Sequence, residues 1–138
     1  MKKSIAILTV SGFMMSGLYA SVGAQAPQSV KEGVYTADQA KRGEALYKDN
    51  CAACHGDDLA GSGPMPALTG NDFITNWKTV GDLYDKINTS MPASAPGSLM
   101  PQQTSDILAY MFSKSNFPAG SAELSVKQDE LTQIKIEK

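Results

Sequence analysis

The sequence has few of the residues that usually hold metals or carry covalent chemistry. Its 138 residues include only two cysteines and one histidine, too few for a structural zinc site, which takes four such ligands. The chain also lacks a basic excess, because 12 Lys and Arg face 14 Asp and Glu. Nucleic-acid binding is therefore not expected, since no cationic surplus exists to neutralise phosphates. With 42% hydrophobic and 19% charged residues, the chain is not a charge-driven disordered protein, and its length fits one domain.

The N-terminal segment has the pattern of a secretory signal peptide. A charged start, Met1–Lys3, precedes an uncharged and mostly apolar stretch over 4–19, and small residues end it. This order predicts cleavage after Ala24, so that residues 1–24 are a targeting segment and not part of the fold. An uncleaved membrane anchor is the alternative, but the apolar run is short for a transmembrane helix. No cysteine precedes position 51, which excludes a lipid anchor on a cysteine near the end of the signal.

The mature chain is expected to be a small acidic protein of the periplasm. Cleavage removes two lysines and no acid, which leaves 10 basic against 14 acidic side chains and a net charge of −4. An exported protein resides in a compartment that permits disulfides. We expect a monomer with no stable membrane insertion.

The scarce reactive residues stand together in Cys51-Ala52-Ala53-Cys54-His55. A disulfide there would close a very short loop and add little stability. A thioredoxin-like dithiol is typically preceded by a strand, whereas the preceding residues here have a helical pattern. The pentapeptide is the signature of covalent c-type haem attachment. Two thiols one helical turn apart can each add to a haem vinyl group, and the histidine then lies under the iron as the proximal ligand. A redox dithiol remains the alternative.

With this motif the sequence resembles the class I cytochrome c family over about residues 36–138. Within that family it is similar to the small periplasmic cytochromes that accompany quinoprotein (PQQ-dependent) alcohol dehydrogenases. The resemblance implies an all-α fold, with about three to four helices wrapped around one covalently attached haem c. We expect a flexible lead-in over 25–35, a haem domain over 36–118 and a C-terminal tail over 119–138 that packs on this domain.

Three segments have the periodicity and the end signals of longer helices. They are residues 36–50, which open with a capping box, residues 79–89, and residues 101–115, which start with proline. The resemblance implies that the first of these helices crosses the last at Gly43, with Tyr47 one turn later. A glycine there costs about 1 kcal/mol relative to alanine in an isolated helix, and a close crossing is a physical reason for it.

The resemblance also implies three contacts around the haem. The carbonyl of Pro66 would accept a hydrogen bond from Nδ1–H of His55, which would fix the ring tautomer and make the ligand more basic. Leu68 would pack on the porphyrin ring. Trp77 would lie near the haem edge, with its indole N–H on a propionate, although an ordinary core tryptophan is the alternative.

The sixth iron ligand is narrowed by elimination. His55 is the only histidine, so ligation by two histidines of this chain is impossible. Met111 lies inside the last helix and fits a core position, and Met65 lies in the proximal loop, far from the opposite face of the haem. Met91 begins the loop after the second long helix, and the resemblance implies that it is the ligand, with Met100 at the other end of that loop as its rival.

These features predict an electron carrier and not an enzyme. A haem ligated by histidine and methionine has no vacant position for substrate, so single-electron transfer is the chemistry that remains. The resemblance implies a quinoprotein dehydrogenase as donor and a terminal oxidase or another cytochrome as acceptor. An acidic surface would favour partners with a basic docking patch. The alternatives are a permanent haem subunit of a dehydrogenase complex, and a ligand-binding or catalytic haem protein with an open sixth site.

Overall fold

The computed structural model describes residues 26–137, so the predicted signal peptide lies outside the described residues. That part of the chain forms six α-helices and one 3₁₀ helix and contains no β-strand. The elements are η1 (Val30–Glu32), α1 (Ala37–Asn50), α2 (Ala52–His55), α3 (Gly70–Ile74), α4 (Val80–Ser90), α5 (Pro101–Lys114) and α6 (Gln128–Leu131). The all-α expectation is confirmed. The three long helices are the predicted ones, whereas α2, α3 and α6 have four or five residues each.

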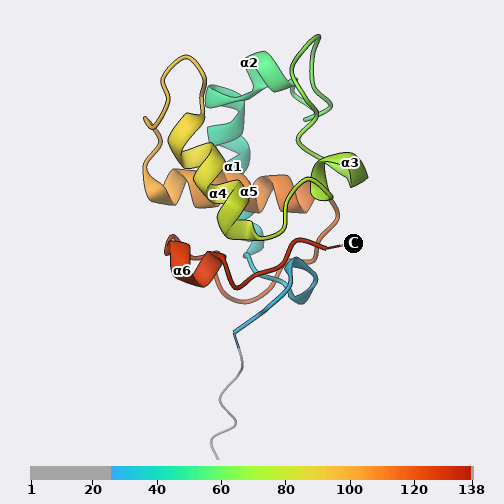
Figure 1. Ribbon diagram of the computed structural model, residues 1–138, viewed down its shortest axis with the longest axis vertical. Coiled ribbons are helices and arrows are strands. Elements are labelled where there is room, and N and C mark those ends of the chain that lie inside the picture. Colours follow the sequence, from blue (N-terminus) through green and yellow to red (C-terminus); the bar gives the residue numbers. More distant parts are fainter. Residues whose placement is uncertain (1–25, 138) are drawn as a thin grey trace, which may run out of the picture.

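Helices α1 and α5 cross at the centre of the molecule (Figure 1). A Cβ atom on Gly43 would lie 1.8 Å from the carbonyl oxygen of Asp106, so no larger residue fits without separating the helices. One turn later, the rings of Tyr47 and Tyr110 pack against each other with tilted planes, at 5.5 Å between centroids. The helix that receives this contact is the core of the protein, because every residue from 104 to 112 in α5 is buried. The glycine therefore serves the close crossing that the resemblance implied.

The long helices begin at the residues that the sequence predicts because side chains satisfy their first backbone N–H groups. The Thr36 hydroxyl accepts from the third N–H of α1 at 3.1 Å. Thr79 and Asp82 form a reciprocal capping box at the start of α4, with bonds of 3.2 and 3.0 Å. Met100 precedes α5 and has no such oxygen, so Gln103 takes over part of the role by accepting from the Met100 N–H at 2.9 Å.

The expected flexible lead-in over 25–35 is wrong for the residues from 29 onward. Val30 is 0% exposed, and Tyr35 is buried with its hydroxyl donating to the Phe117 carbonyl at 2.7 Å. The backbone N–H of Val30 also donates to the backbone carbonyl of Lys135 at 3.1 Å. The buried side chains of Val30, Val34 and Tyr35 follow no helical or strand period, so no local signal in the sequence indicates their burial. The hydrogen-bond partners of Val30 and Tyr35 lie about a hundred positions away in the sequence.

The C-terminal tail lies between two other segments and bonds to both. Its residues 134–136 exchange backbone hydrogen bonds with residues 28–30 on one side and residues 78–80 on the other, at 2.8 to 3.1 Å. We call this arrangement the clasp. Figure 1 shows it at the lower end of the molecule, together with η1 and α6.

Two side chains of α1 fasten the tail further along. The buried amide of Gln39 accepts from the Leu124 N–H at 2.7 Å and donates to the Leu124 carbonyl at 3.2 Å. Arg42 binds the buried carboxylate of Asp106 through Nε at 3.0 Å and reaches Glu123 at 2.8 Å. Within residues 26–137, no helix combines the length and the apolar character needed to cross a bilayer.

Candidate functional site

The cysteine–histidine motif occupies the turn that directly follows α1. Cys51 ends α1, and its N–H donates to the Tyr47 carbonyl at 2.8 Å. The next turn is α2, in which the His55 N–H donates to the Cys51 carbonyl at 3.0 Å. This turn ends at Gly56, where φ is +79°. Cys51 is half-buried, Cys54 is exposed, and His55 is 8% exposed. The two thiols thus lie one turn apart, as the spacing predicts.

A loop folds back beneath this turn and holds it. The Tyr47 hydroxyl donates to the Gly56 carbonyl at 2.7 Å, and the Gly61 N–H donates to the His55 carbonyl at 2.9 Å. Leu59 is fully buried, and its carbonyl accepts from the Leu68 N–H at 2.8 Å. The loop from 59 to 71 is therefore fixed at several points against the motif.

The same loop selects the tautomer of the histidine ring. Nδ1 of His55 lies 2.9 Å from the carbonyl oxygen of Pro66. A carbonyl oxygen only accepts, so Nδ1 carries a proton, and in the neutral ring Nε2 is then the nitrogen with the lone pair. A neutral imidazole with a free Nε2 is the form that binds a metal ion. The hydrogen bond that the resemblance implied is present.

Burial makes the free thiol of Cys51 a poor nucleophile. Desolvation, and then the neighbouring Cys54, raise the pKa of Cys51 from 9.0 to about 11. A redox dithiol requires the opposite, because its attacking cysteine has a lowered pKa. No strand precedes the motif in the part of the chain that is described. Both observations disfavour a redox dithiol.

The side chains near the motif suit a large apolar group with an acidic edge. Several apolar residues pack against the core but keep part of their surface uncovered, among them Leu68, Trp77 and Met91. The indole Nε1 of Trp77 is buried and has no hydrogen-bond partner within the described residues. An indole N–H can only donate, so a carboxylate brought by a bound group would satisfy it. A haem has both an apolar ring and propionates, and it fits these residues.

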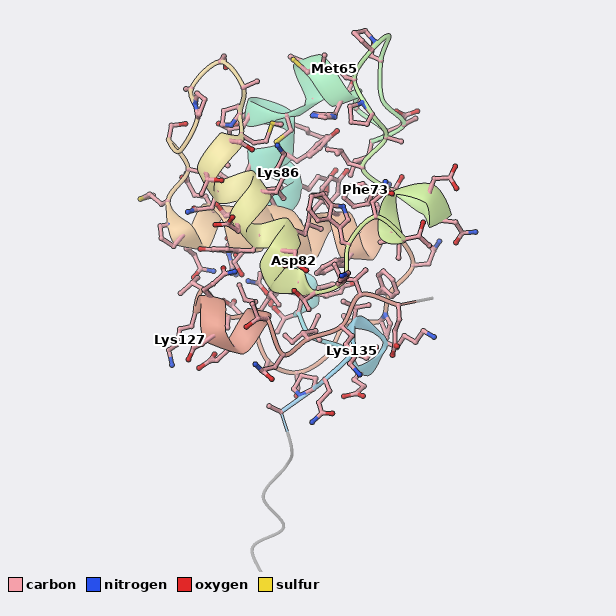
Figure 2. The ribbon with its side chains drawn as sticks, viewed as in Figure 1. Met65, Phe73, Asp82, Lys86, Lys127 and Lys135 are labelled. Atoms are coloured by element: carbon pink, nitrogen blue, oxygen red, sulfur yellow. The ribbon has the colours of Figure 1, made fainter. Side chains whose placement is uncertain are left out.

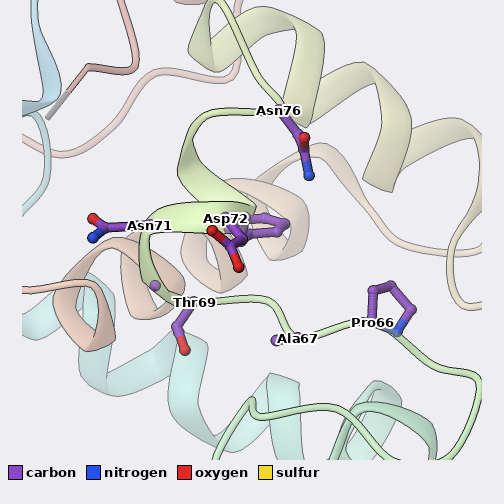
Figure 3. Close-up of a pocket in the computed structure, with 8 residues that line it drawn as sticks. Pro66, Ala67, Thr69, Asn71, Asp72 and Asn76 are labelled. Carbon is purple, nitrogen blue, oxygen red and sulfur yellow. The ribbon is translucent and has the colours of Figure 1, made fainter.

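A pocket of about 580 Å³ opens beside the proximal loop. It is lined by Pro66, Ala67, Thr69, Gly70, Asn71, Asp72, Phe73 and Asn76. Figure 3 shows the chain from Pro66 to Thr69 along one side and α3 along the other. The ring of Phe73 packs against Trp77 at 6.2 Å between centroids. The pocket is thus continuous with the residues around the motif.

The structure separates the four methionines of the described residues. Met65 and Met100 are exposed, at 40% and 62%. Met111 is 1% exposed inside α5. Met91 is half-buried against the core, at the point where α4 ends and the chain becomes extended with φ −120° and ψ 154°. Only Met91 combines contact with the interior and an incompletely enclosed side chain.

Comparison with known proteins agrees with the geometry. Residues 38–111 match the family described as cytochrome c oxidase, cbb3-type, subunit III. The chain belongs to the class I cytochrome c family. Its cofactor is accordingly one covalently bound haem c, and the fold is the all-α cytochrome c fold.

The relatives of this cytochrome are of different sizes. It is 37% identical over 89 residues to "Cytochrome c-551" of Bacillus subtilis (strain 168), which covers 62% of this chain and 69% of the relative. It is 34% identical over 84 residues to "Cbb3-type cytochrome c oxidase subunit CcoP" of Rubrivivax gelatinosus. That match covers 55% of this chain and 26% of the relative, so this cytochrome spans about a quarter of that subunit.

A solved structure with a similar fold is that of the sulfane dehydrogenase SoxCD from Paracoccus pantotrophus. The TM-score is 0.55 at 25% identity, over 76% of this chain and 53% of the other. The likeness covers about half of that chain and concerns the fold.

The structure brings most of the predicted site residues together and sets one apart. Cys51, Cys54, His55 and Pro66 lie in one hydrogen-bonded unit, and Met100 is in solvent. Sequence reasoning missed the hydroxyl of Tyr47, which it assigned only to the helix crossing. No local signal pointed to this bond, because the carbonyl of Gly56 is a backbone acceptor that any residue at this position would have.

Proposed function

We propose that this cytochrome carries single electrons, with Cys51 and Cys54 as the haem thioethers and His55 and Met91 as the iron ligands. The observation that carries the ligand assignment is the contrast between Met91, which is half-buried, and Met100, which is 62% exposed. A thioether in solvent at the start of α5 would have to bring its helix inward to reach the iron. Met91 is already turned toward the core at the end of α4.

The bound haem supplies reversible one-electron exchange between Fe(III) and Fe(II). The chain tunes that exchange. The Pro66 carbonyl holds the Nδ1 proton of His55 and orients the ring, which makes Nε2 a stronger ligand. The thioether of Met91 favours Fe(II), as do the apolar neighbours Leu68 and Trp77. Each cycle takes one electron from a donor and gives one to an acceptor, with no atom transferred.

For the partners, we propose a quinoprotein dehydrogenase as donor and a terminal oxidase or another cytochrome as acceptor, in the periplasm. The resemblance of residues 83–131 to cytochromes that accompany quinoproteins supports the donor. Similarity to a domain of an oxidase subunit supports the acceptor. A reduced quinoprotein alcohol dehydrogenase that fails to reduce the purified cytochrome would contradict the donor assignment.

A second candidate is a permanent haem subunit of an oxidoreductase. The observation that favours it is that two relatives, CcoP and SoxCD, are named as parts of larger enzymes. Purification from the native source at high salt separates the two candidates. A free carrier elutes as a monomer, whereas a subunit remains with its dehydrogenase.

The ligand assignment is tested by adding carbon monoxide to the reduced haem-loaded protein. We expect no change in the visible spectrum of the parent protein, because the sixth position is held. Met91→Ala should bind carbon monoxide promptly and lose its thioether-to-iron charge-transfer band. Met100→Ala is the matched control and should behave as the parent. A prompt response of the parent protein would overturn the electron-carrier proposal in favour of ligand binding. A response of Met100→Ala alone would show that Met100, and not Met91, is the sixth ligand.

A further inference from the structure

The end of the molecule that bears the motif has almost no charge. Residues 59–71 and 87–105 contain no Asp, Glu, Lys, Arg or His, and the motif between 51 and 56 contains only the buried His55. Figure 1 shows α2 and the two loops, 59–71 and 91–100, extending toward the same end of the molecule. We call this surface, formed by α2 and these two loops, the uncharged face.

The uncharged face also exposes apolar side chains. Of the three large hydrophobic side chains that are exposed within residues 26–137, two lie in its loops, Met65 and Met100. Figure 2 shows Met65 beside α2 at the upper end of the molecule. A flexible thioether suits contact with varied surfaces. Apolar side chains that stay exposed can contribute to an interaction site when a partner surface covers them.

Few charged side chains adjoin this face, and most of the others lie on the rest of the molecule. Asp57 and Asp58 follow α2, and Lys48 at the end of α1 is paired with Glu44 at 2.8 Å. At the opposite end, η1, α6 and the clasp carry charges of both signs. Figure 2 shows Lys127 and Lys135 there. The acidic excess of the chain is therefore not concentrated on the face that bears the motif.

The exposed Cys54 places the attached group at this face. Its side chain reaches solvent on α2, whereas Cys51 is half-buried. A haem held by both sulfurs would therefore have its more exposed attachment point at Cys54. Electron transfer is fastest over short distances, so a partner that docks elsewhere would exchange electrons more slowly.

We infer that the redox partner docks on the uncharged face with an apolar, uncharged surface of its own. This inference rests on the proposed function as an electron carrier. It replaces the expectation of a basic docking patch, because a cationic surface would find only Asp57 and Asp58 among the residues of α2, the two loops and the link between them. Association depends on apolar contact, so it should change little with salt, which screens charges beyond about 10 Å at 0.1 M.

Coated gold electrodes provide partners of defined chemistry for the test. The haem-loaded protein is studied by voltammetry on three coatings: mixed methyl and hydroxyl groups, carboxylates, and ammonium groups. We expect the fastest electron exchange on the methyl and hydroxyl coating. Its rate should change less than about twofold between low and physiological salt, because the contact contains no ion pairs.

Substitutions at the two ends of the molecule sharpen the test. Met65→Lys adds a charge to the uncharged face and should slow exchange on the methyl and hydroxyl coating about tenfold, because docking would desolvate an ammonium group. Met65→Gln is neutral and should slow it less. Gln133→Lys adds the same charge at the opposite end, on an exposed residue, and should leave the rate unchanged.

The outcomes separate this inference from the function on which it rests. Fast, salt-sensitive exchange confined to the ammonium coating would overturn the apolar docking face and restore a basic partner. Equal slowing by Met65→Lys and Gln133→Lys would overturn it too. If the protein exchanges electrons neither on any coating nor with a small dissolved mediator, the electron-carrier proposal fails instead.

Discussion

The two ends of this cytochrome are stabilised in different ways. At the upper end, the motif lies on a single helical turn beside two uncharged loops. Apolar side chains such as Leu68 and Met91 remain partly uncovered there. At the lower end, the clasp is closed by backbone hydrogen bonds, and Gln39 binds the tail from inside the core. The lower end thus provides its own partners, whereas the upper end is shaped for a group that the polypeptide does not contain.

Loss of the haem should have the largest effect and fall mainly on the upper end. The double substitution Cys51→Ser and Cys54→Ser removes both attachment points, so the haem no longer covers the apolar residues around the motif. We expect a loss of haem stain on a denaturing gel and rapid amide exchange at Gly61 and Leu68. The thermal midpoint should fall by more than in any lower-end variant. Slow exchange at those two amides in the haem-free chain would contradict the conclusion that the upper end depends on the haem for its stability.

A substitution at Gln39 tests the lower end. Gln39→Leu keeps the volume of the side chain but leaves the N–H of Leu124 without a partner in the interior, whereas the Leu124 carbonyl still accepts from the Ser105 hydroxyl at 2.7 Å. An unsatisfied buried group costs about 1–3 kcal/mol, so we expect a loss of about 2 kcal/mol in the free energy of unfolding. The visible spectrum should stay that of the parent. Gln133→Leu, at an exposed position, is the control in chemical denaturation, and an equal loss there would contradict the role of Gln39.

The smallest expected effect concerns Tyr35, whose hydroxyl donates to the Phe117 carbonyl at 2.7 Å. Burial raises the pKa of Tyr35 above its ordinary value of 10.0. The folded state therefore holds this proton more tightly than the unfolded chain, so its contribution is complete below pH 10 and is lost as the pH rises through the folded pKa. Tyr35→Phe should lower the stability at neutral pH by about 1 kcal/mol. It should also flatten the decline above pH 10, as measured by denaturant midpoints; an unchanged alkaline slope would contradict this assignment.

The long helices could be predicted from sequence because their signals are local. Caps at Thr36 and Thr79 and the proline at 101 mark the starts, and apolar periodicity marks the buried faces. The clasp could not be predicted. Its bonds join residues 134–136 to residues 28–30 and 78–80, and no local period or cap in these segments points to the others.

The site residues also differ in whether a local signal predicts them. Cys51, Cys54 and His55 are adjacent in sequence, so the motif alone predicts their arrangement. The preference for Met91 over Met100 came from the family resemblance and not from a motif of this kind, because both residues precede a proline at the ends of one loop. Their exposure depends on how α4 and α5 pack, and only the fold reveals it.

The clasp also determines how the molecule would respond to a mechanical load. Residues near 29 and 135 run parallel to each other, and the bonds from the Val30 N–H and the Lys135 N–H join them at 3.1 and 2.8 Å. Tension applied to the chain before residue 28 and after residue 136 pulls these segments past each other along their length. Both bonds then bear the load at the same time. The fold therefore resists stretching in a shear geometry, in which the bonds must break together, and not in one where they break one after another.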